Sequence, residues 1–182
     1  MPYDQSDVVK AFDIIVEWMQ KDIEAMINVG SNFAAALCIL VYSEALGRFR
    51  NATIGDRRNE AARQAFKYFL GQMGYDDSDK AERIYSDLRN GMAHSYFPNK
   101  DMRFIMDGGS KGIDLNASTG AKLYIRKTFD EFKNAIPKVR KDINDPDVSN
   151  KIIRNIRTCM GSGPSVSPPT SISRWVTDRS GA

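Results

Sequence analysis

Apolar residues recur at spacings of three and four along the first part of the chain, which is the pattern of amphipathic helices. The spacing predicts a first helix that is capped by Asp7 and ends at Gly30. Its apolar face is formed by Val8, Phe12, Ile15, Trp18 or Met19, Ile23, Met26 and Ile27. A second helix, over residues 31–48, is apolar nearly all round in its first half, which favours the centre of a bundle. A third helix is predicted over residues 57–72.

Two further helices follow after Gly-Tyr-Asp-Asp at positions 74–77. The fourth begins at a capping box formed by Asp79 and Glu82, and it stops before Pro98. The fifth runs over about residues 121–143 and contains Pro137, which should kink the helix or end its regular part.

The hydrophobic period changes between the fourth and fifth helices. Residues 102–106 and 112–116 flank the sequence Asp-Gly-Gly-Ser, which is favourable for a tight turn. We therefore expect a small β-hairpin at about residues 102–116.

These elements predict an all-α fold, namely an up-and-down bundle of four to five helices with a small β-hairpin insertion and a flexible C-terminal tail. The length of 182 residues is enough for one domain with a full core and an appendage. The bundle is expected over residues 1–145, followed by a short basic helix at 146–160. Residues 161–182 are rich in glycine, serine and proline, which is the composition of a flexible tail.

Charge and cysteine content narrow the function classes only slightly. The formal net charge is +3. Residues 138–182 carry a net charge of +4 and the residues before them −1, so the basic character lies at the C-terminal end. Cys38 lies in an apolar run and Cys159 near the tail, which argues against a disulfide framework and for a reducing compartment. The longest apolar run is ten residues, whereas a membrane span needs roughly 20. The start of the chain has no signal-peptide pattern, so we expect a cytoplasmic protein without a membrane segment.

The segment Arg-Asn-Gly-Met-Ala-His-Ser-Tyr at positions 89–96 carries the chemistry. It holds His94, the only histidine of the chain, five residues after Arg89. Histidine has an unperturbed pKa of about 6.5 and can exchange protons at neutral pH. The planar guanidinium of arginine matches phosphate oxygens. Together they suit metal-free cleavage of RNA, in which the imidazole activates the ribose 2′-hydroxyl and the guanidinium stabilises charge on the phosphoryl group.

Helical geometry restricts how this pair could act. On a regular α-helix Arg89 and His94 lie about 140° apart and do not point at one place. Either the helix opens at Gly91, or two copies of the segment face each other in a symmetric dimer. The dimer would also supply a second histidine, so that both a general base and a general acid are present.

The pattern resembles the HEPN family (higher eukaryotes and prokaryotes nucleotide-binding domain), in which an Arg is followed after four to six residues by a His. Asn90 matches the polar residue that often follows this Arg, and Glu44 resembles the polar residue that an earlier helix places near the site. The resemblance implies a homodimeric, metal-independent endoribonuclease with catalytic residues Arg89, His94 and Asn90. Tyr96 matches HEPN toxins paired with a nucleotidyltransferase antitoxin, which implies that a partner could adenylylate it. A toxin or phage-defence effector acting on RNA is therefore the leading hypothesis.

Simpler interpretations stand beside each of these assignments. HEPN-like domains can bind RNA or a protein without catalysis, and a helical interaction protein without a nucleic-acid role is a third possibility. Tyr96 could be a packing residue, and Glu44 could simply pair with Arg48 at the next helical turn. Asp87 could orient His94 or only solvate the helix. No cofactor is expected, and the three Cys and His residues are too far apart in sequence to predict a metal site.

Overall fold

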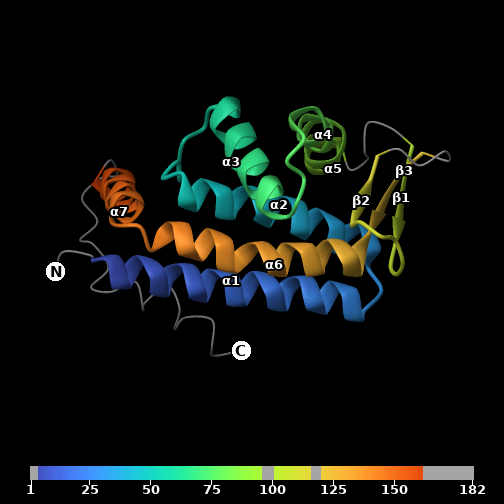
Figure 1. Cartoon of the computed structure of the whole chain (residues 1–182), viewed down its shortest axis with the longest axis horizontal. Helices are drawn as coiled ribbons and strands as arrows, with labels where there is room; N and C mark the ends of the chain where they lie inside the picture. The colour runs from blue at the N-terminus through green and yellow to red at the C-terminus, as the bar shows by residue number, and fades with distance from the viewer. Residues whose placement is uncertain (1–3, 96–100, 116–119, 162–182) are drawn as a thin grey trace.

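The chain folds into a bundle of helices with a small β-sheet at one end (Figure 1). The computed structural model describes residues 4–95, 101–115 and 120–161, with the side chains of residues 94, 95, 160 and 161 left out. The elements in chain order are α1 (Gln5–Asn28), α2 (Asn32–Arg50), α3 (Asn59–Gln72), α4 (Ser78–Arg83), η1 (Ile84–Asn90), α5 (Gly91–Ser95), β1 (Met102–Ile105), β2 (Ile113–Asp114), β3 (Ala121–Tyr124), α6 (Ile125–Ile143) and α7 (Pro146–Gly161). The predicted helical bundle with a small β insertion is confirmed.

Helix α2 lies at the centre of the bundle, as its nearly continuous apolar sequence predicts. Helices α1 and α6 run beside it, α3 and the α4–α5 segment lie against its other side, and α7 and the sheet occupy opposite ends (Figure 1). The core between these helices is rich in fully buried aromatic rings, such as Phe69 and Phe132, whose centroids are 5.2 Å apart. Burial of each such ring contributes roughly 1.5–3 kcal/mol to stability.

Gly47 permits a close approach of α2 and α3 in the core. A Cβ atom at this position would lie 2.0 Å from the carbonyl oxygen of Ala65, so any side chain would push α3 away from α2. This glycine sits inside a helix, where it costs about 1 kcal/mol relative to alanine. The close packing of α2 and α3 is what compensates for that cost.

The sheet differs from the hairpin that the sequence predicts. Strands β1 and β2 do not pair with each other; β3 lies between them, parallel to β1 and antiparallel to β2. Residues 121–124, which we expected to begin the fifth helix, form this central strand, and α6 begins at Ile125. Leu123 is fully buried while its neighbours are half-buried, so the strand places one apolar side chain into the core.

Two predicted helix starts are also corrected. Asp4, not Asp7, caps α1, and Asp7 is the reciprocal partner in a capping box: its N–H donates to the Asp4 carboxylate at 3.0 Å. Asp77, rather than Asp79, caps α4 by accepting from the N–H groups of residues 79 and 80. Glu82, the other half of the predicted box, instead forms ion pairs with α3.

Pro137 lies inside α6, which ends at Ile143 as predicted, so of the two outcomes expected for this proline, a kink or an end of the regular helix, the second does not occur. Helix α7 then crosses the end of the bundle and buries Ile152 and Ile153 against it. The predicted tail lies outside the described residues from 162 onward. Among the described helices, none combines the length and apolar content that crossing a membrane requires.

Candidate functional site

The segment that carries the predicted chemistry is a continuous helix with a change of pitch. After α4, residues 84–90 form a π-helix (η1), and α5 follows from Gly91. Gly91 has ordinary right-handed helical angles, φ −58° and ψ −50°, so the helix does not open there as one of our alternatives required. The π-helix has i→i+5 hydrogen bonds and occurs often at functional sites. Its wider turn ends at Asn90, immediately after Arg89.

Arg89 is held against a buried carboxylate on another helix. Its Nε lies 2.6 Å from Oε2 of Glu44 on α2, and the side chains are 17% and 7% exposed. The N–H is not aligned with the carboxylate oxygen, so the contact is an ion pair without a well-formed hydrogen bond. The guanidinium carbon also lies 5.8 Å from the ring centroid of Tyr85, a cation–π distance. These contacts fix the direction of the Arg89 side chain.

Asn90 contacts Arg89 directly. The Arg89 Nη1 atom donates to Oδ1 of Asn90 at 3.0 Å. The Asn90 amide oxygen and the Glu44 carboxylate thus contact two different nitrogen atoms of the same guanidinium. This is the contact that a positioning role for Asn90 requires.

Glu44 lies between two arginines rather than one. Its Oε1 accepts a hydrogen bond from Nε of Arg48 at 2.8 Å, while its Oε2 faces Arg89. The sequence left open whether Glu44 pairs with Arg48 or lies beside Arg89, and in the structure it does both. One carboxylate against two permanent cations leaves the cluster with a net charge of +1.

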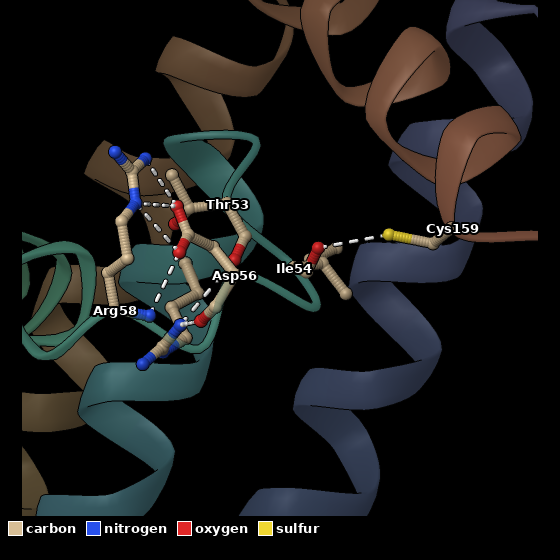
Figure 2. Close-up of polar contacts among 6 residues, drawn as sticks. Thr53, Ile54, Asp56, Arg58 and Cys159 are labelled. Atoms are coloured by element: carbon tan, nitrogen blue, oxygen red, sulfur yellow. Dashed lines mark hydrogen bonds and ion pairs between the residues drawn. The ribbon is translucent and has the colours of Figure 1, made fainter. Parts of the chain in front are cut away.

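Arg48 is in turn fixed by the loop between α2 and α3. Its Nη1 donates to the carbonyl oxygen of Asp56 at 2.5 Å. Within the loop, Asp56 and Arg58 face each other and form a 2.7 Å ion pair (Figure 2). Hydrogen bonds from Arg58 lower the pKa of the Asp56 carboxyl to about 2. The Asp56 carboxylate therefore keeps its charge, and its ion pair with Arg58, above that pH.

Helix α7 contributes one contact to the same loop. The Cys159 thiol donates to the carbonyl oxygen of Ile54 at 3.1 Å (Figure 2). A Cβ atom on Gly55, which has a φ of +81°, would lie 2.9 Å from this sulfur. The C-terminal helix therefore packs closely on the loop that supports Arg48.

The remaining predicted residues lie on or beyond the same helical segment. Asp87 is on η1, and its carboxylate accepts from Oγ of Ser86 at 3.3 Å. The backbone of His94 belongs to α5, whereas its side chain and the whole of Tyr96 lie outside the described residues. The structure therefore brings together Arg89, Asn90 and Glu44, and the catalytic or supporting roles of all six residues stay predictions.

Sequence reasoning missed two supports of this cluster. Tyr85 lies four residues before Arg89, a spacing that marks helical neighbours and could have indicated the contact. The hydrogen bond from Arg48 to the Asp56 carbonyl joins a side chain to a loop backbone, and no sequence pattern predicts such a contact. Within the described residues, no group of three or more His, Cys, Asp or Glu side chains could hold a metal ion.

Comparisons with protein-family models, with curated proteins and with solved structures found no match to this chain.

Proposed function

We propose that this chain is a HEPN-like, metal-independent endoribonuclease that acts as a homodimer. The observation that carries the proposal is the placement of Arg89. It is the permanent cation of the Arg-x4-His pattern, and a carboxylate, an amide and an aromatic ring hold it in one orientation. A guanidinium fixed before substrate binds needs no reorganisation when charge develops on a phosphoryl group.

In the proposed reaction, His94 removes the proton from a ribose 2′-hydroxyl, and the resulting oxygen attacks the adjacent phosphorus. The bond from phosphorus to the 5′-oxygen breaks, and a protonated histidine donates a proton to that leaving oxygen. The products are a 2′,3′-cyclic phosphate and a free 5′-hydroxyl. Arg89 stabilises the negative charge on the non-bridging oxygens, and Asn90 and Glu44 position Arg89.

The dimer follows from the need for two histidines in this reaction. Because Gly91 is helical, opening of the helix at that residue does not bring Arg89 and His94 together. A symmetric interface along α5 would instead place the His94 residues of two chains at one phosphate. Sedimentation analysis should give a dimer, and a monomer that retains full cleavage activity would contradict this part of the proposal.

The proposal extends to silencing by a nucleotidyltransferase partner, with Tyr96 as the residue adenylylated. Incubation with a small nucleotidyltransferase, ATP and Mg²⁺ should add one AMP to the chain and abolish cleavage. The Tyr96→Phe variant should gain no mass and remain active. Transfer of AMP to another residue, or none, would contradict the toxin–antitoxin version without affecting the nuclease proposal.

The decisive experiment is incubation of the purified protein with RNA in EDTA, beside Arg89→Ala and His94→Ala. Arg63→Ala is a matched control, since Arg63 is 45% exposed on α3 and lies outside the Glu44 cluster. Cleavage should occur without metal and be lost in the first two variants only. Binding of RNA without cleavage would favour a non-catalytic RNA-binding module and would contradict the enzymatic proposal.

A further inference from the structure

A cleft of about 340 Å³ lies between the α4–η1 segment and the sheet, and the residues that line it do not include Glu44, Arg48 or Arg89. Lys80 and Ile84 line one wall, and Ser110, Lys111 and Ile113 line the other. Pockets for small molecules have volumes of about 300–1,000 Å³, so the cleft is large enough for one small ligand. Its walls combine apolar surface with two ammonium groups.

The loop between β1 and β2, which forms one wall, is held in shape by close packing. Gly109 has a φ of +76°, and a Cβ atom there would lie 2.4 Å from the ring of Tyr124. At the other end of the loop, the N–H of Gly112 donates to Oε1 of Glu131 at 2.9 Å. A loop fixed at both ends presents the residues between them in a defined position.

A buried tyrosine connects this loop to the body of the protein. The Tyr75 hydroxyl donates to Oε2 of Glu131 at 2.6 Å and accepts from the N–H of Ile113 at 2.7 Å. Tyr75 itself is only 7% exposed. The wall of the cleft that carries Ser110 and Lys111 is therefore braced from the connection between α3 and α4.

Several hydrogen-bond donors between the fixed ends have no partner in the part of the chain that the structure describes. Among the described residues, the Ser110 hydroxyl, the Lys111 ammonium and the amide N–H groups of residues 109–111 make no hydrogen bond or ion pair. Across the cleft, Lys80 forms an ion pair with the exposed Asp77 at 3.6 Å, a contact that contributes little to stability in water. With Asp114 also on the wall, the side chains that line the cleft sum to a net charge of +1.

We propose that this cleft binds the phosphate group of a small organic phosphate. Two ammonium groups from opposite walls, a hydroxyl and unpaired backbone amides suit a tetrahedral anion with several acceptor oxygens better than a planar carboxylate. The half-buried side chains of Leu115 and Tyr124 supply an apolar surface for the organic part of the ligand. The site goes beyond the proposed nuclease activity and does not depend on it.

The test is titration of the full-length ¹⁵N-labelled protein with three probes: AMP, inorganic phosphate and adenosine. AMP should bind saturably and shift the amide resonances of residues 109–112, and adenosine should bind at least tenfold more weakly. Binding of inorganic phosphate as tight as that of AMP would support the phosphate site and identify free phosphate as its ligand. Absence of shifts in this loop at millimolar AMP and phosphate, or equal binding of adenosine and AMP, would overturn the proposal.

Single substitutions locate the site. Lys111→Ala and Lys80→Ala should each weaken AMP binding about tenfold, because each removes one charge-assisted contact equivalent to about 1.4 kcal/mol. Both lysines are exposed, so circular dichroism should remain unchanged. Lys10→Ala on α1 is the matched control, since this exposed lysine does not line the cleft, and it should bind AMP as the unaltered protein does. Unchanged affinity in both Lys80→Ala and Lys111→Ala would also overturn the proposal.

Discussion

Replacement of Glu44 by glutamine tests whether this buried carboxylate holds the two arginines. The substitution keeps the size and shape of the side chain but removes its charge and replaces one acceptor oxygen by an NH2 donor. Arg48 and Arg89 would then face each other across a neutral amide, with side chains that are only 20% and 17% exposed. Their charges would be left without the carboxylate that compensates them.

The magnitude follows from the burial of the three groups. Removal of one partner of a buried ion pair destabilises a protein by about 3–5 kcal/mol. The remaining exposure of both arginines lets water solvate them in part, so the lower end, about 3 kcal/mol, is expected. For a chain of this length, 1 kcal/mol corresponds to about 2–4 °C in melting temperature, so Glu44→Gln should lower it by roughly 6–12 °C.

The assay is urea unfolding of Glu44→Gln beside Glu17→Gln. The control removes the charge from an i,i+4 pair of the same kind, Glu17 with Lys21, whose side chains are 62% and 68% exposed. Exposed pairs contribute little, so this control should cost less than about 0.5 kcal/mol. If Glu44→Gln costs no more than Glu17→Gln, the reasoning about the buried cluster is refuted.

Three further predictions concern packing, pH and assembly. Gly47→Ala should destabilise the protein by about 1–3 kcal/mol or more, because the new Cβ would meet the Ala65 carbonyl. Gly71→Ala on α3 should be neutral or stabilising, because a Cβ there would lie 3.6 Å from its nearest neighbour, an ordinary contact distance. Equal free energies of unfolding for the two variants would contradict the close α2–α3 contact. Burial and a carboxylate partner raise the pKa of Tyr75 above its ordinary value, so the unfolded chain ionises first and stability should fall as the pH rises above about 10. In Tyr75→Phe this alkaline loss, measured by urea unfolding from pH 8 to 11, should be smaller, and an unchanged slope would count against the Tyr75 network. Titration of the His94→Ala variant into the unaltered protein should reduce RNA cleavage per active chain if the site is shared by two chains, and unreduced activity would count against a shared site.

Much of the fold could be predicted because most of the helices are amphipathic, and the spacing of their apolar residues is visible within a short stretch of sequence. The spacing of apolar residues gave the positions of α1, α2 and α3, and the apolar run at the start of α2 indicated its central place. The pairing of the strands was not accessible in this way. The Asp-Gly-Gly-Ser sequence is compatible with a hairpin turn. The strand order nevertheless depends on β3, which lies between β1 and β2 and whose Leu123 is buried in the bundle.

The sequence pattern singled out three residues of the candidate site, but it did not predict the π-helix or the loop contact that support them. The pattern singled out Arg89, Asn90 and Glu44, and the structure places these three in contact. The π-helix that carries Arg89 has no sequence signature, since a single widened turn arises from how the helix packs rather than from local preference. The second ion pair of Glu44 depends on the loop that anchors Arg48, which is likewise a tertiary contact.

The central claim is that Arg89 and His94 cleave RNA without a metal, and end-group analysis of the products tests it most directly. RNA incubated with the unaltered protein in EDTA should yield fragments that end in a 2′,3′-cyclic phosphate and begin with a 5′-hydroxyl. Arg89→Ala and His94→Ala should yield none, while Arg63→Ala should match the unaltered protein. Intact RNA in every reaction, or cleavage that survives both Arg89→Ala and His94→Ala, would contradict the claim.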